Sequence, residues 1–209
     1  VLSITVPAGL GVLAKETAVM LPFYALLIEW AVFRLRRLGD GTPARQLDWR
    51  VGALFVATVV LPLIMGMAWL LPELLKPQAW ASRDFTMGTR LLSEARIVAD
   101  YVGWTLVPTP GALSFYHDNF QVSSSLLSPW STLTSVIFLL ALILLLPWWR
   151  RRQPIAALGL ALFLGCHLLT GTILPLELIY EHRNYFASFG LMLAVVPLLG
   201  LFLLTSVVT

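Results

Sequence analysis

The chain has 209 residues, of which 58% are hydrophobic and 12% are charged, about half of the charged share usual in soluble proteins. Several apolar runs reach about 17–22 residues, the length that a helix needs to cross a hydrocarbon core of ~30 Å. The single cysteine, Cys166, excludes an internal disulfide framework and a cysteine-based metal site. The net charge of +3 would fit nucleic acid, but the arginine positions explain it better as a membrane signal, so we predict no nucleic-acid partner.

The apolar runs predict an all-α fold, a polytopic membrane helical bundle with about five transmembrane helices, forming one membrane domain over residues 1–209. Residues 2–14 would reach only ~20 Å as a helix, so we interpret them as the end of a truncated span or as a re-entrant piece. The chain starts at Val1 inside this run, and we expect a fragment of a longer protein. The predicted spans are 17–33, 50–71, 129–149, 154–175 and 186–205. We expect kinks within the spans at Pro22, Pro62 and Pro197.

Two arginine clusters predict the orientation of the spans. The link 34–50 carries five arginines and the link 150–152 carries three, and links rich in Lys and Arg face the cytoplasm. Two spans and one loop separate these links, so both can lie on the same side. The other polar segments are then extracytoplasmic: Lys15-Glu16, residues 72–128 and the loop before the last span.

Residues 72–128 are too long for a simple connection and predict an extracytoplasmic helical segment. We expect a helix from about Thr86 to just before Pro108. Its apolar face, at helical spacing, consists of Leu91, Ala95, Val98 and Val102. Its i, i+4 charge pairs, expected on the opposite, wet face, are Arg90–Glu94 and Arg96–Asp100. The pattern fits an amphipathic helix on the membrane surface and a helix packed against the bundle equally well.

The polar stretch before the last span is the strongest candidate site. Within eight residues of an otherwise apolar tail lie Glu177, Glu181, His182, Arg183 and Asn184. A solvated turn between two spans is the alternative. Arg183 can bind phosphate oxygens through two parallel hydrogen bonds, His182 can transfer a proton, and either glutamate can orient them. This set suits a reaction that releases phosphate while a hydroxyl is deprotonated.

Three other polar positions are candidates. Lys15 and Glu16 form either an interfacial anchor or part of a site. His117 and Asp118 form either a plain turn or a catalytic or metal-binding pair. His167 lies within a predicted span, where a neutral histidine bonded to a neighbour competes with a functional role. We predict no defined metal ligand set and no certain cofactor, with a divalent metal as an open option.

Motifs for soluble nucleotides are absent from the sequence: it has no P-loop, no G-x-G-x-x-G and no H-E-x-x-H. An enzyme on the outer face without nucleotide machinery needs a substrate that is already activated. Lipid-linked substrates are the obvious supply.

Four stretches together resemble a known family: AKETAVMLPFYALLIEW, RDFTMGTRLLSEARIVADYV, HDNFQVSSSLLSP and ILPLELIYEHRNYFASFGL. They are similar to the membrane part of bacterial proteins that join a multispan domain to tetratricopeptide repeats, and to the related eukaryotic O-mannosyltransferases of the GT-C glycosyltransferase fold. The resemblance covers most of residues 15–191. In that family a catalytic acidic residue lies in the first outer loop, which would precede Val1, and the repeats would follow Thr209.

The resemblance implies a polyprenyl-phosphate-linked sugar donor, a protein hydroxyl acceptor and a site facing the periplasm from the bacterial inner membrane. The residues expected to act in catalysis are Glu16, Asp118, Glu181 and His182. The residues expected to bind substrate are Lys15, His117, Glu177, Arg183 and Asn184. Two alternatives remain open: a polymerase or ligase for lipid-linked glycans, and a non-catalytic membrane scaffold or transporter subunit.

Overall fold

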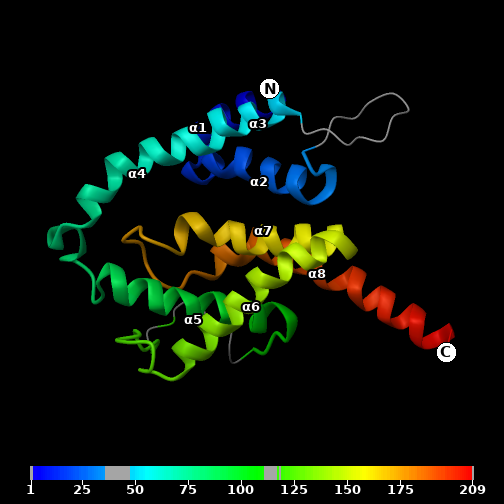
Figure 1. The fold of residues 1–209 in the computed structure, drawn as a ribbon. Helices are drawn as coiled ribbons and strands as arrows, with labels where there is room; N and C mark the ends of the chain where they lie inside the picture. Colours follow the sequence, from blue (N-terminus) through cyan, green and yellow to red (C-terminus); the bar gives the residue numbers. More distant parts are fainter. Residues whose placement is uncertain (1, 36–47, 111–116, 118, 209) are drawn as a thin grey trace. The chain divides into compact units, whose positions relative to one another are not determined.

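A computed structural model describes residues 2–35, 48–110, 117 and 119–208 (Figure 1). The chain is 78% helical, and no strand occurs among the described residues. It divides into two compact units, residues 1–71 and residues 72–209, and each is described by itself. The all-helical membrane fold expected from the apolar runs is confirmed.

The first unit consists of three apolar helical stretches. The first is α1 (Leu2–Ala14), and the second joins η1 (Glu16–Met20), α2 (Leu21–Ile28) and η2 (Glu29–Phe33). The third joins α3 (Trp49–Phe55), η3 (Val56–Val60) and α4 (Leu61–Leu74), which continues into the second unit. The π-helical turns of η3 end at Val60, two residues before Pro62. A proline has no N–H for the carbonyl four residues earlier, which explains a change of helix type at this point.

Four helical stretches are long and apolar enough to cross a membrane. Among the described residues they are Glu16–Phe33, Trp49–Leu74, Ser131–Arg152 and Glu181–Ser206. The remaining predicted span, 154–175, corresponds to α7 (Pro154–Thr170), which ends earlier and has only 17 residues. At 1.5 Å per residue α7 is about 26 Å long, slightly short of a full hydrocarbon core. The chain is therefore an integral membrane protein with four helices of spanning length and two shorter apolar ones.

In the second unit, α6 (Ser131–Arg152), α7 and α8 (Glu181–Val208) pack with α5 (Met87–Leu106). Small residues bring the backbones of α7 and α8 together at Gly159 and Gly190. A Cβ atom at Gly159 would lie 2.3 Å from the Ala194 nitrogen, so only glycine fits there. Close approach through small residues is the usual packing mode of helices in membranes, where burial of apolar surface gives little drive. The buried core of this unit consists of Ile97, Val98, Tyr101, Phe163, Ala187 and Leu191.

The helix expected between Thr86 and Pro108 is present as α5, preceded by η4 (Pro77–Trp80). Thr86 caps its N-terminus: the Thr86 hydroxyl accepts from the Thr89 N–H, and the Thr89 hydroxyl accepts from the Thr86 N–H. The faces of α5 differ from the prediction, because Arg90 and Glu94 are buried rather than wet and Leu91 is 42% exposed. The helix packs on α6 and α8, and the loop that follows α7, rather than solvent, covers Arg90.

A buried chain of polar side chains lies at the N-terminal end of α6. Ser93 of α5, Ser123 and Thr132 of α6 form a buried hydrogen-bonded chain there, with O···O and N···O distances of 2.8 Å. The arginines at positions 150–152 lie at the other end of α6. A helix of 22 residues is about 33 Å long, so roughly the thickness of a hydrocarbon core separates the two ends.

Candidate functional site

A cavity of about 430 Å³ opens where the last turns of α5 meet the first turns of α8. It is lined by Tyr101, Trp104, Thr105, Glu181, His182, Asn184, Tyr185 and Ser188. Three of the four residues of the EHRN motif at 181–184 therefore line one cavity. Hydroxyl, amide, imidazole and carboxylate groups stand here against three aromatic rings, which is the composition of a site for a polar organic ligand.

The first turn of α8 is held against α5 by hydrogen bonds. The Tyr101 hydroxyl accepts from the Tyr180 N–H at 3.1 Å and donates to the Tyr180 carbonyl at 3.0 Å. One turn further along both helices, the Asn184 amide donates to the Thr105 hydroxyl at 3.0 Å. The Asn184 side-chain oxygen is buried without a hydrogen-bond partner, so the cavity wall retains an unused acceptor.

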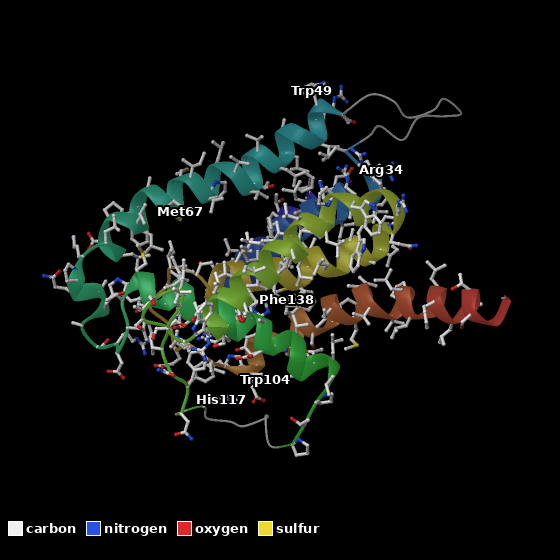
Figure 2. All side chains as sticks on the ribbon, turned by 60° about the horizontal axis from the view of Figure 1, so that its bottom comes forward. Arg34, Trp49, Met67, Trp104, His117 and Phe138 are labelled. Atoms are coloured by element: carbon white, nitrogen blue, oxygen red, sulfur yellow. The ribbon has the colours of Figure 1, made fainter. Side chains whose placement is uncertain are left out.

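His117 contacts two of the residues that line this cavity, although it lies 64 residues before Glu181 in the chain. Its Nε2 is 2.9 Å from the Glu181 Oε1. The His117 ring stacks on Trp104, with ring centroids 5.0 Å apart and planes inclined by 10° (Figure 2). The imidazole thus has a fixed plane and a carboxylate partner, as in a histidine–carboxylate pair used for proton transfer. Asp118, expected beside it, lies outside the described residues.

Arg183 and Glu177 interact with each other and with the loop, and neither lines the cavity. The Arg183 Nη1 donates to the Glu177 carbonyl at 2.5 Å, and its guanidinium lies 5.0 Å from the centre of the Tyr180 ring. The Glu177 carboxylate pairs with Arg83. None of the described residues lining the cavity carries a permanent positive charge. The phosphate-binding role expected of Arg183 would require its side chain to leave the Glu177 carbonyl.

A fully buried arginine, Arg90, holds the loop between α7 and α8. Its Nε donates to the Thr172 carbonyl at 2.9 Å and its Nη2 to the Thr170 carbonyl at 2.8 Å, while Nη1 donates to the Leu176 carbonyl. The sequence pattern predicted for Arg90 only an ion pair with Glu94 on the wet face of the helix. The sequence shows that Arg90 lies one turn inside a capped amphipathic helix. This position does not indicate that its partner is the loop after α7.

The carboxylate of Glu94 is the charged partner of Arg90. Its Oε1 is 2.7 Å from the Arg90 Nη2, although the angle is too poor for a hydrogen bond. Burial is the main effect on both groups: it raises the pKa of Glu94 to about 7 against the attraction of Arg90 and Arg183, and it lowers the pKa of Arg90. The Glu94 carboxyl group is thus half protonated near neutral pH.

Tyr101 remains protonated at any physiological pH. Burial raises its pKa to about 12, although the hydrogen bond with the Tyr180 backbone acts in the opposite direction. Burial likewise raises the pKa of Asp100, against the attraction of Arg96 and His117. The Tyr101 hydroxyl is therefore a permanent donor to the Tyr180 carbonyl.

Among the described residues, the side chain of His167 in α7 makes aromatic ring contacts rather than hydrogen bonds. Its ring stacks on Tyr101 at 5.3 Å and meets Phe163 edge to face at 5.1 Å. It is 6% exposed, and its Nε2 is buried without a hydrogen-bond partner. The side chain serves as an aromatic filler behind Tyr101, and the neighbour bond expected for it is not made at Nε2.

Lys15 and Glu16 belong to the unit of residues 1–71, between α1 and η1. The Lys15 N–H donates to the Gly11 carbonyl at 2.8 Å, and the Lys15 carbonyl accepts from Ala18 at 3.0 Å. Glu16 is the first residue of η1. The substrate and catalytic roles expected for this pair stay predictions.

A larger cavity of about 850 Å³ lies at the other end of α5, around Trp80, Phe85 and Met87. Because α5 has 20 residues and is about 30 Å long, this cavity and the one beside α8 are separate. No group of three His, Cys, Asp or Glu side chains suited to a metal ion occurs among the residues that the structure describes.

The helices and the cavity define the chain as an integral membrane protein with a polar pocket at one end of its helices. Comparisons with protein-family models, with curated proteins and with solved structures gave no match to this chain. The geometry of the pocket and the sequence resemblance are the two grounds for the function proposed below.

Proposed function

We propose that this chain is a GT-C-like membrane glycosyltransferase module. It transfers a sugar from a polyprenyl-phosphate carrier to a hydroxyl group of a protein acceptor, at the periplasmic face of a bacterial inner membrane. The observation that carries the proposal is that Glu181, His182 and Asn184 line one cavity of about 430 Å³ and that His117 pairs with Glu181. A solvated turn would not need a stacked imidazole paired with a carboxylate across 64 residues of chain.

The chemistry assigned to the pocket is a substitution at the anomeric carbon. The acceptor hydroxyl oxygen forms a bond to that carbon, the bond from the carbon to the phosphate oxygen breaks, and phosphate leaves with the bonding electron pair. In this proposal Glu181 takes the proton of the acceptor hydroxyl while His117 orients the carboxylate. Asn184 and Thr105 offer hydrogen-bonding groups for sugar hydroxyls.

The departing phosphate needs positive charge, which the cavity lining lacks. Arg183 is the nearest candidate by sequence, since it follows His182 directly, and among the described residues its guanidinium contacts the Glu177 carbonyl and the Tyr180 ring. We assign to it the binding of phosphate once donor is present. Lys15, Glu16 and Asp118 keep the roles that the resemblance implies for them.

The opposite ends of α7 support the proposed orientation of the pocket. The arginines at 150–152 lie just before the start of α7 and follow the rule for cytoplasmic ends, whereas Tyr101, which lines the cavity, stacks on His167 near the other end of α7. A polyprenyl carrier keeps its chain in the bilayer and presents its phosphate at the interface. A pocket at the end of membrane helices suits such a donor.

Sugar transfer by the full-length protein in lipid vesicles tests the proposal, with radiolabelled polyprenyl-phosphate sugars as donors and mass spectrometry of the acceptor. Replacing the proposed base by Glu181→Gln should lower kcat by about 100-fold or more. Arg183→Ala should lower transfer as well. The matched control is Glu73→Gln, because Glu73 is an exposed glutamate paired with Lys76. Full activity of the folded Glu181→Gln protein, or no transfer by the unmodified protein with any donor, contradicts the proposal.

A further inference from the structure

The loop between α7 and α8 depends on α5 for its backbone hydrogen bonds. Residues 171–180 contain no helix or strand, so the carbonyl and N–H groups of this partly buried loop need other partners. Arg90 supplies three donors to the carbonyls at Thr170, Thr172 and Leu176. Eleven residues further along α5, the Tyr101 hydroxyl forms hydrogen bonds with both the carbonyl and the N–H of Tyr180. The loop is thus fastened at its beginning and at its end.

The hydroxyl of Tyr101 has a position that does not depend on the loop. The side chain is 2% exposed, its ring meets Trp104 edge to face at 5.5 Å, and it stacks on His167 at 5.3 Å. Two rings from two different helices therefore fix its orientation. Tyr180, which it binds, is the last residue before α8 begins at Glu181.

We propose that Tyr101 is a positioning residue for the pocket: its hydroxyl fixes the Tyr180 backbone and so sets the first turn of α8, which presents Glu181 to His117 and Asn184 to Thr105. Arg90 fixes the upstream end of the same loop. The distances that this turn must satisfy are 2.9 Å from Glu181 to His117 and 3.0 Å from Asn184 to Thr105. The effect on catalysis rests on the proposed function, whereas the effect on geometry does not.

The test of the geometry uses the full-length protein labelled with ¹⁵N-tyrosine in lipid nanodiscs. Tyr101→Phe keeps both ring contacts and removes only the hydroxyl. We expect the Tyr180 amide to exchange with solvent at least tenfold faster, because it loses its acceptor, and the ring resonances of ¹⁵N-labelled His117 to shift, because Glu181 moves. Tyr24→Phe removes a hydroxyl from the other unit and should leave both signals unchanged.

The test of the consequence is the sugar-transfer assay. Tyr101→Phe should lower kcat at least tenfold with KM changed less than threefold, since the reacting groups are displaced while the cavity keeps its rings. Thr132→Val is the control for simple loss of stability. It breaks the 2.8 Å hydrogen bond to Ser123 and should lower the melting temperature without changing kcat or the Tyr180 signal.

Each outcome separates the two claims. If the Tyr180 amide exchanges with solvent at an unchanged rate, the Tyr101 hydroxyl does not fix the Tyr180 backbone, and the proposal is overturned. Faster exchange with unchanged His117 resonances and unchanged kcat overturns the positioning role. Absence of transfer by the unmodified protein contradicts only the proposed function, and the exchange and resonance measurements then still decide whether Tyr101 positions the first turn of α8.

Discussion

The consecutive helices α6 and α7 have similar apolar sequences and opposite surroundings within their unit. Of the 22 residues of α6 only Thr132 is buried, whereas ten of the 17 residues of α7 are buried. The difference follows from side-chain size: α6 carries a run of leucines and isoleucines, and α7 alternates large residues with alanine and glycine. Hydrophobicity alone therefore does not distinguish a helix that faces lipid from one that packs on protein, but the small residues do.

The largest difference between α6 and α7 is expected when one large side chain on each helix is truncated and the free energy of unfolding is measured. Phe163→Ala removes a fully buried ring of α7 and should lower the free energy of unfolding by about 3–5 kcal/mol. Leu144→Ala on α6, where the side chain is 74% exposed, should change it by less than about 0.5 kcal/mol. Unfolding in mixed micelles measures both, and equal losses would show that α6 packs as tightly as α7.

The second test concerns α5. This helix buries the charged residues Arg90 and Glu94, whereas α7 buries alanines and glycines. Glu94 has a pKa of about 7 in the folded protein and 4.5 as its ordinary value, so the folded state binds the proton more tightly. The free energy of unfolding should therefore fall as the pH rises from about 4.5 to 7, in total by about 3 kcal/mol. The difference between the unmodified protein and Glu94→Gln, measured across this range, isolates the effect. A difference that stays constant with pH would rule it out.

The third and smallest effect compares two glycines. Gly159→Ala would place a Cβ atom 2.3 Å from the Ala194 nitrogen and 2.5 Å from the Gly190 carbonyl oxygen, so the backbones of α7 and α8 must separate. We expect a loss of about 1–3 kcal/mol. Gly200→Ala has open space around it and should cost nothing, because alanine favours helix more than glycine does. Melting temperatures of the two variants provide the measurement, and equal values would argue against close backbone packing.

The helices were predictable from the sequence because long apolar runs leave few alternatives in a membrane. The cap at Thr86 and the end of α5 near Pro108 also followed from local signals. The burial of Arg90 and Glu94 did not, since an i, i+4 charge pair looks the same on a wet face and beneath a loop. The periodicity of a sequence predicts which residues share one face of a helix. It does not predict which segment of the folded chain covers that face.

For the candidate site, the clustering of polar residues at 177–184 predicted a segment of which three residues line the cavity. The structure divides that cluster: Glu181, His182 and Asn184 line the cavity, whereas Glu177 and Arg183 fasten the loop. Tyr101 could not be predicted, because a tyrosine in an amphipathic helix carries no sign of a backbone partner 79 residues later.

The glycine contact between α7 and α8 also bears on how the protein is made. With two backbones this close, the pair can associate as soon as both have left the ribosome, before any contact with other helices is required. The polar loop that joins them would then reach its side of the membrane together with the hairpin, as one insertion step. Biogenesis of the pocket would end when this hairpin packs on α5, which leaves the ribosome earlier and supplies hydrogen-bond partners for the loop.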